Sequence, residues 1–166
     1  MFPETLRDSA EAVLLAARQA GLKLATAESC TGGLIAAALT DIAGSSDVLE
    51  RGFVTYSNQA KCELLGVGKR LLEGPDAPGA VSAEVARAMA EGALANSAAD
   101  IAVSVTGIAG PGGGTATKPV GLVHLACARK GSDTLHERHV FTGDRAAVRL
   151  AAVQAALALV RKQIGR

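Results

Sequence analysis

The chain has 166 residues, a length typical of one domain with a substantial core, and we expect residues 1–166 to form a single domain. Its 17 Lys and Arg residues nearly balance its 16 Asp and Glu residues, so the formal net charge is only +1 at pH 7. Proteins that bind duplex DNA or anionic membranes carry a basic surface. Neither nucleic acid nor a membrane is therefore expected as a partner.

The three cysteines, Cys30, Cys62 and Cys127, are odd in number and lack CxxC or CxxH spacing. This pattern predicts neither a disulfide framework nor a zinc site, and it fits a reducing compartment. The first residues have the charged, amphipathic pattern of a helix rather than the uninterrupted apolar segment of a secretory signal. No apolar run reaches the length of a membrane span. We therefore expect a cytoplasmic protein without a metal site.

The first third of the chain predicts a helix, a strand, a tight turn and a second helix. Apolar residues recur at helical spacing up to Ala20, and Gly21 is suited to end that helix. A short apolar run then meets the turn Glu28–Gly33 (ESCTGG), which leads directly into another segment of helical periodicity. The predicted elements are a helix over 5–20, a strand over 22–27 and a helix over 34–43.

The middle of the chain alternates strand and helix patterns. The segment GFVTYS has the β-branched and aromatic residues favoured in strands, and Ser82 is a typical helix N-cap. The predicted elements are a strand over 52–57, a helix over 58–65, a loop over 66–80, a helix that ends near 95, and a strand over 101–106.

The last part predicts two strands over 120–129 and 134–141, joined by a short Gly-containing loop as an antiparallel hairpin. Asp144 then caps a long helix over 145–163. Together these elements predict an α/β fold, three-layer α/β/α, with a mixed, mostly parallel sheet and one antiparallel hairpin. Sites in such sheets lie beyond the carboxyl ends of the parallel strands, where Ser29 and Thr106 are expected.

Ser29 is the first candidate for chemistry, because it lies between a predicted strand and the Gly-assisted start of a helix. Unpaired N–H groups at such a start, here those of Cys30, Thr31 and Gly32, can bind an anion as an oxyanion hole does. The local sequence favours a simpler interpretation, in which the hydroxyl of Ser29 or Thr31 only caps the helix. A catalytic role therefore depends on finding a base.

A serine hydroxyl is a weak nucleophile until a neighbouring group accepts its proton. The three histidines lie on the late hairpin, where a histidine is more often structural. Lys61 follows the second predicted strand closely, near Tyr56, although a lone lysine is ordinarily solvated. As a base it would need a pKa lowered by burial or by a nearby cation. Arg145 could supply that cation, or it could be an exposed charge beside Asp144.

Five glycines occur between positions 107 and 114, directly after the third predicted strand. The run matches neither the phosphate-loop motif nor a complete dinucleotide-binding motif, so it predicts either a plain mobile connection or a wall of the substrate crevice. In the second case the supporting residues are Thr106, Gly107, Gly110 and Gly112. Cys30 is the rival nucleophile to Ser29, although a cysteine in such a turn is more often a small packing residue.

Five segments stand out together: TAESCTGG, TDIAGSS, RGFVTYSN with the following Lys61, SVTGIAGPGGG with KPVG, and FTGDRAAVR. In these segments the chain closely resembles the CinA C-terminal domain family, and in particular its stand-alone nicotinamide-nucleotide amidases. The resemblance spans nearly the whole sequence, and several long motifs in the same order are far more specific than any single one. Longer members carry an additional N-terminal domain, whose activities are not expected here.

The resemblance implies an α/β/α fold and hydrolysis of nicotinamide mononucleotide to nicotinate mononucleotide and ammonia, in pyridine-nucleotide salvage. It implies Ser29 as the nucleophile, Lys61 as the general base and Tyr56 as the third member of a Ser/Lys/Tyr arrangement. Thr106 and Arg145 would support the substrate or the dyad. No metal and no cofactor are implied, and the expected partner is a small nucleotide. An Ala-rich surface leaves room for a helix-mediated homo-oligomer.

Two other functions stay open at this point. The family name comes from competence and DNA damage, so a non-catalytic nucleotide-binding regulatory module is one alternative, although the near-neutral charge argues against direct DNA binding. A related amidase that acts on another pyridine or amide is the second. Release of ammonia from nicotinamide mononucleotide separates the first alternative from an amidase.

Overall fold

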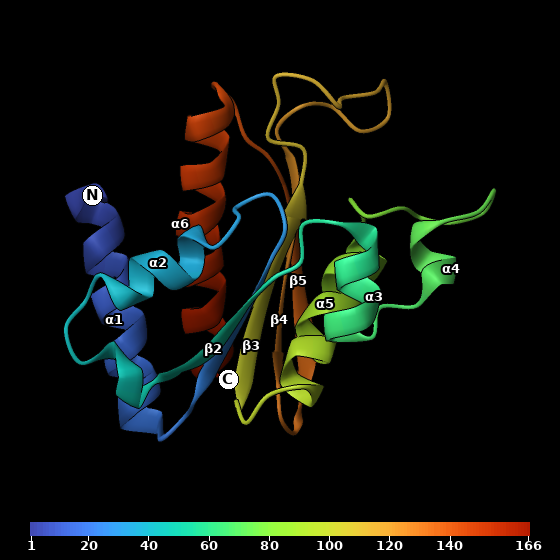
Figure 1. The fold of residues 1–166 in the computed structure, drawn as a ribbon. Coiled ribbons are helices and arrows are strands. Elements are labelled where there is room, and N and C mark those ends of the chain that lie inside the picture. The colour runs from blue at the N-terminus through green and yellow to red at the C-terminus, as the bar shows by residue number, and fades with distance from the viewer.

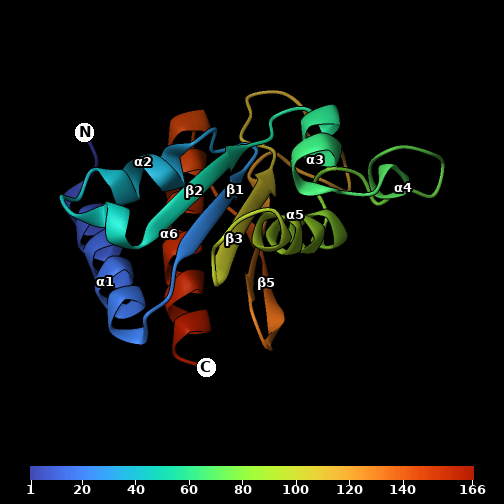
Figure 2. The ribbon, with the colours of Figure 1, turned by 60° about the horizontal axis from the view of Figure 1, so that its bottom comes forward.

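A computed structural model describes residues 1–166 and shows a five-stranded sheet with helices on both faces (Figure 1; Figure 2). The strands are β1 (Leu24–Glu28), β2 (Leu49–Val54), β3 (Ile101–Gly107), β4 (Leu122–Arg129) and β5 (Ser132–Val140). Their order is β2-β1-β3-β4-β5, with β1 parallel to both of its neighbours. Because β4 is antiparallel to β3 and β5, it alone runs against the other four strands. The predicted fold class is confirmed.

The helices form two layers. The first layer consists of α1 (Glu4–Ala20), α2 (Leu34–Thr40) and α6 (Arg145–Ile164), and the second of α3 (Asn58–Leu65), α4 (Lys69–Leu72) and α5 (Ala83–Ala95). A short 3-10 helix, η1 (Ser45–Asp47), precedes β2. One apolar core lies between the sheet and the first layer, and another lies between the sheet and the second. No helix combines the length and the apolar character needed to cross a membrane.

Local signals fix most helix ends. The side chain of Asp144 accepts the N–H of Ala147 at 2.9 Å, and that of Ser82 accepts the N–H of Val85 at 3.2 Å. These are the predicted N-caps of α6 and α5. Small residues also allow close helix packing, as their abundance predicts: a Cβ added at Gly92 would lie 2.0 Å from the carbonyl oxygen of Leu65. Helix α5 can therefore approach the end of α3 only through a glycine.

The largest boundary error concerns β2, predicted over 52–57 but found at Leu49–Val54. Its neighbour β1 ends at Glu28, which pairs with Val54, so no further ladder partner exists for the residues that follow. Tyr56 therefore lies in the connection to α3 rather than in a strand. The short elements η1 and α4 were not predicted, and α2 ends at Thr40 rather than at 43.

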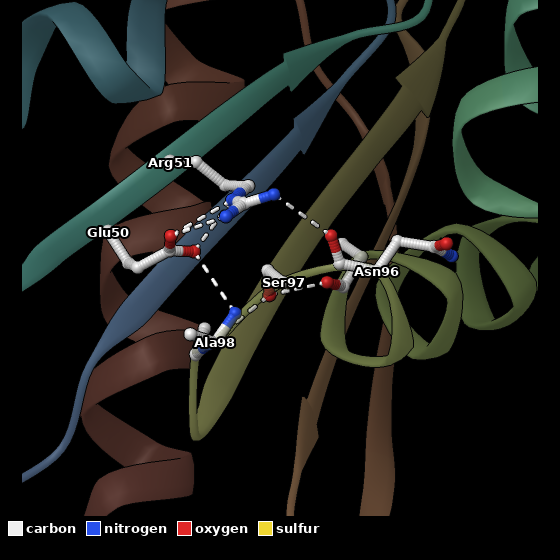
Figure 3. A network of polar contacts seen from close by, with 7 residues as sticks. Glu50, Arg51, Asn96, Ser97 and Ala98 are labelled. Atoms are coloured by element: carbon white, nitrogen blue, oxygen red, sulfur yellow. Dashed lines mark hydrogen bonds and ion pairs between the residues drawn. The ribbon is translucent and has the colours of Figure 1, made fainter.

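A network of polar contacts at the surface joins edge strand β2 to the segment between α5 and β3 (Figure 3). Its members, here called the Glu50 network, are Glu50, Arg51, Asn96, Ser97 and Ala98. The Glu50 carboxylate accepts the N–H of Ala98 at 3.3 Å and pairs with Arg51 at 2.7 Å. Arg51 also donates to the carbonyl oxygen of Asn96 at 3.2 Å. This network lies near the start of β3, away from the carboxyl ends of the parallel strands.

Candidate active site

The carboxyl ends of β1 and β2, together with α3, bring Ser29 and Lys61 into contact. Ser29 directly follows β1, and Lys61 lies on α3 just after β2. The Lys61 Nζ atom lies 3.0 Å from Ser29 Oγ, within hydrogen-bond distance, and donates to the carbonyl oxygen of Thr55 at 2.7 Å. The geometry therefore supplies a serine hydroxyl and a lysine amine in direct contact.

Lys61 is almost fully buried, with 1% of its surface exposed. It takes part in no ion pair, and burial lowers its pKa below the ordinary value for lysine. Of the two causes considered from the sequence, burial is the one that acts, because Arg145 is not among the groups that shift this pKa. The neighbouring Thr55 hydroxyl is also buried and has no hydrogen-bond partner. Such uncompensated polar burial is typical of functional sites.

The turn after Ser29 leaves two main-chain donors without acceptors. The N–H of Ser29 donates to Val105 at 3.0 Å, and the N–H of Gly32 donates back to the carbonyl oxygen of Ser29 at 3.0 Å. The N–H groups of Cys30 and Thr31 donate to no protein acceptor. Gly32, at φ 60°, adopts the left-handed conformation that closes this turn. Two adjacent free donors beside a serine could hold an oxyanion.

Neither hydroxyl in the turn caps α2, so the simpler interpretation of the sequence is wrong. The N-cap of α2 is Gly33, without a side-chain cap. Instead the fully buried carboxylate of Glu28 accepts the N–H of Ile35 at 2.8 Å, the N–H of Ala36 at 3.0 Å and the hydroxyl of Thr31 at 2.7 Å. A carboxylate at a helix N-terminus satisfies free N–H groups and matches the helix dipole. Sequence reasoning missed this residue, although an acid directly before a Gly-assisted helix start was a usable signal.

Arg149 is a second missed residue. It extends from α6 to the turn, where Nε donates to the carbonyl oxygen of Cys30 at 3.1 Å and Nη2 donates to that of Thr31 at 2.9 Å. It lies one helical turn after Arg145 and ends the segment FTGDRAAVR, so position alone could have suggested it.

Tyr56, Arg145 and Gly110 form a separate group, which adjoins the site through Thr55, the residue before Tyr56. The Arg145 guanidinium donates to the Tyr56 hydroxyl at 2.9 Å and to the carbonyl oxygen of Gly110 at 2.8 Å. Tyr56 is 60% exposed, and no hydrogen bond joins it to Ser29 or Lys61. Arg145 therefore ties the Gly-rich loop to the segment that precedes α3.

Thr106 and the glycines mainly shape the backbone at the end of β3. The buried Thr106 hydroxyl donates to the carbonyl oxygen of Ala80 at 2.8 Å, which fixes the segment before α5. A Cβ at Gly107 would lie 2.7 Å from Val123, and one at Gly110 would lie 2.6 Å from Val120. These two glycines allow the loop to fold back onto the start of β4. Gly112 faces open space and is exposed.

The rival groups are poorly suited to the chemistry. Burial raises the pKa of the Cys30 thiol to about 11, so the reactive thiolate is scarce at neutral pH. His124 and His136 lie on β4 and β5, with ring nitrogens 3.0 Å apart, and burial lowers the pKa of His124 to about 4. Neither imidazole contacts Ser29. No cluster of three His, Cys, Asp or Glu side chains is placed to hold a metal ion.

The model of the CinA C-terminal domain family matches residues 6–164. A protein of Enterobacter agglomerans named nicotinamide-nucleotide amidohydrolase PncC is 52% identical over 152 residues, which cover 92% of this chain and 91% of that protein. A CinA-like protein of Akkermansia muciniphila is 53% identical over 148 residues, but these cover 89% of this chain and only 35% of that protein. The chain thus spans about a third of the length of several curated relatives it matches.

Among solved structures, the competence/damage inducible protein CihA from Agrobacterium tumefaciens superposes with a TM-score of 0.94 at 49% identity. The superposition covers 100% of this chain and 99% of that one. The family match, the relatives and the shared fold agree with the five segments singled out in the sequence. The chain belongs to the CinA C-terminal domain family.

Proposed function

We propose that the chain is an amidohydrolase that converts nicotinamide mononucleotide to nicotinate mononucleotide and ammonia, through Ser29 activated by Lys61. The observation that carries this proposal is the 3.0 Å contact between Ser29 Oγ and the Nζ of a buried lysine without an ion-pair partner. The name and the nearly full coverage of the relative from Enterobacter agglomerans support the substrate. Such a reaction belongs to pyridine-nucleotide salvage.

The first step forms an acyl-enzyme. In its neutral form Lys61 keeps one N–H on the Thr55 carbonyl oxygen and offers its lone pair to the Ser29 hydroxyl. It accepts that proton while Oγ attacks the carboxamide carbon. The carbonyl oxygen becomes an anion, which the N–H groups of Cys30 and Thr31 stabilise. The C–N bond then breaks, and the proton on Lys61 goes to the departing nitrogen, so that ammonia leaves.

The second step releases the acid. Lys61 is neutral again once ammonia has left, and it accepts a proton from a water that attacks the nicotinyl ester. The same two N–H groups hold the second oxyanion. Its collapse breaks the bond to Ser29 Oγ, which recovers its proton from Lys61. The product leaves as the acid and loses its carboxyl proton to water, giving nicotinate mononucleotide.

The rest of the nucleotide would lie against the mouth of the site. The exposed guanidinium of Arg145, now bonded to Tyr56 and Gly110, is the cation best placed to exchange a main-chain carbonyl for the phosphate. The exposed N–H of Gly112 lies in the same loop and could add a donor. Binding energy from the phosphate would orient the carboxamide toward Ser29.

Ammonia release from nicotinamide mononucleotide by Ser29→Ala and Cys30→Ala variants tests the proposal. Ser29→Ala should reduce kcat by about 10⁴-fold or more with little change in nucleotide binding, because it removes the covalent step. Cys30→Ala should retain most activity, because its thiol is buried and protonated. Full activity in Ser29→Ala together with a loss in Cys30→Ala would assign the nucleophile to the cysteine. Nucleotide binding by a wild type that releases no ammonia would indicate the regulatory module instead.

A further inference from the structure

We infer that Arg149 is a positioning residue that orients and polarises the N–H of Thr31 as the principal oxyanion donor. This inference deepens the proposed function, since it names the group that prepares the site for the anion formed on the substrate. It rests on two hydrogen bonds to consecutive carbonyl oxygens, not on contact with the substrate.

The peptide planes of the turn explain how Arg149 acts. In a trans peptide the C=O and the N–H point in opposite directions. Arg149 Nε holds the carbonyl oxygen of Cys30, so the N–H of Thr31 in the same peptide must point away from α6. That N–H has no protein acceptor. Fixing the carbonyl therefore fixes a free donor.

The next peptide is held from the same side chain. Arg149 Nη2 holds the carbonyl oxygen of Thr31, and the N–H in that peptide, from Gly32, closes the turn by donating to Ser29. One planar guanidinium thus fixes two successive peptides, a geometry that the single ammonium of lysine does not reproduce. The guanidinium packs directly against Gly32, where an added Cβ would lie 3.4 Å from Nη2.

Arg149 takes part in no ion pair, so no carboxylate neutralises its charge. A cation bonded to a carbonyl oxygen draws electron density from the amide and makes its N–H a stronger donor. Burial raises the pKa of the Cys30 thiol, and the positive charge of Arg149 acts in the opposite direction but is the smaller effect. The charge of Arg149 therefore reaches the groups of the turn. Arg149 therefore supports an anion through both the orientation and the polarity of the turn.

The variants Arg149→Met and Arg149→Lys test the inference, with Arg129→Met as a matched control. Arg129 also donates to two consecutive carbonyl oxygens, those of Gln163 and Ile164, both at 3.0 Å, at the far end of α6. We expect Arg149→Met to reduce kcat for ammonia release by about 10²-fold, the scale of losing one oxyanion donor, with KM changed less than about threefold. Arg149→Lys should recover only part of the loss. Arg129→Met should keep wild-type kcat.

Chemical rescue provides a readout that a general loss of folding does not give. Methylguanidinium should restore part of the kcat of a cavity-forming Arg149→Ala variant, whereas methylammonium at the same concentration should not, because only the planar cation can hold both carbonyls. Melting temperatures of all variants should be compared in parallel. If Arg149→Met does not fold, the kcat and KM of Arg149→Lys decide the question. A kcat within about twofold of wild type in a folded Arg149 variant would overturn the inference.

Acylation of Ser29 by p-nitrophenyl acetate separates this inference from the choice of substrate. The reagent needs the nucleophile and the oxyanion donors but not the nucleotide-binding groups. Wild type that is acylated at Ser29 yet releases no ammonia from nicotinamide mononucleotide would contradict the proposed substrate. The role of Arg149 would still be tested, because the acylation rates of wild type and Arg149→Met can be compared. If the Arg149→Met variant is acylated as fast as wild type, the proposed role of Arg149 is overturned, whatever the substrate is. A wild-type Ser29 that is never acylated overturns it as well.

Discussion

Charged residues occur at both ends of the sheet, but they are used in different ways. Glu50 and Arg51, near the start of β3, are paired with each other at the surface. At the carboxyl ends of β1 and β2, Glu28, Lys61 and Arg149 form no ion pair and bond to the main chain or to uncharged hydroxyl groups. An exposed ion pair contributes little, whereas a buried charge held by the backbone fixes that backbone. The comparison indicates that charged side chains organise the backbone at the carboxyl ends of the strands, whereas at the opposite end they pair with each other.

Among the charged residues at the two ends of the sheet, replacing Lys61 by Met should have the largest effect. The variant loses the base that contacts Ser29, so kcat for ammonia release should fall by about 10³-fold. The free energy of unfolding in urea should not decrease correspondingly, because the change removes a buried ammonium without an ion-pair partner. Arg51→Met is the control at the opposite end and should keep full activity. Equal activity losses in the two variants would contradict the view that only the charged residues at the carboxyl ends of the strands serve the reaction.

The pH dependence of kcat/KM should report the lowered pKa of Lys61. Only the neutral amine can accept the Ser29 proton, so activity should rise about tenfold per pH unit and level off below 10.5, the ordinary lysine value. Because the folded state binds fewer protons than the unfolded state between these two pKa values, the free energy of unfolding should rise with pH in that window. A rise in kcat/KM that continues up to pH 10.5 would contradict a buried, desolvated base.

Glu28→Gln should reduce stability by about 2 kcal/mol, because bonds from two main-chain N–H groups to a carboxylate become bonds to a neutral amide. Urea unfolding measures this effect. Activity should fall as well, since the same carboxylate holds Thr31 and the start of α2 beside the nucleophile. A Glu28→Gln protein as stable as wild type would show that the buried charge does not organise the turn.

The same substitution at Glu50 should have the smallest effect. Glu50→Gln removes an exposed pair with Arg51 and weakens one contact to Ala98, so the expected loss is about 0.5 kcal/mol in urea unfolding. Ammonia release should stay at the wild-type level. A loss as large as that of Glu28→Gln would mean that the two ends of the sheet depend equally on their charges.

Much of the fold could be predicted from local signals. The helix of residues 58–65 has the predicted bounds, and Ser82 and Asp144 are N-caps as expected. Periodicity and capping depend on neighbouring residues, so the sequence displays them directly. The end of β2 was misjudged because it is set by its partner: β1 stops at Glu28, and no property of the segment GFVTYS reveals this.

The residues of the candidate site likewise fall into those that the sequence indicated and those that it did not. Ser29 and Lys61 were identified through their motifs, and the structure adds the contact between them. Arg149 and Glu28 were missed because Arg149 bonds main-chain atoms alone and Glu28 holds two main-chain N–H groups besides hydroxyls. The partners of Arg149 lie 119 and 118 residues away in the sequence. Main-chain N–H and C=O groups are the same at every residue, so the sequence offered only positional signals for Glu28 and Arg149 and did not identify the groups that they bond.

Tyr56 has a further use in the laboratory. It is the only tyrosine, and the chain has no tryptophan, so the ultraviolet fluorescence of the native protein comes chiefly from one ring, which follows directly on Thr55. Its hydroxyl accepts a hydrogen bond from Arg145, which itself contacts the Gly-rich loop. A ligand that draws the guanidinium away changes the surroundings of this fluorophore. Entry of a ligand can therefore be followed in real time, without a label and in an inactive Ser29→Ala protein.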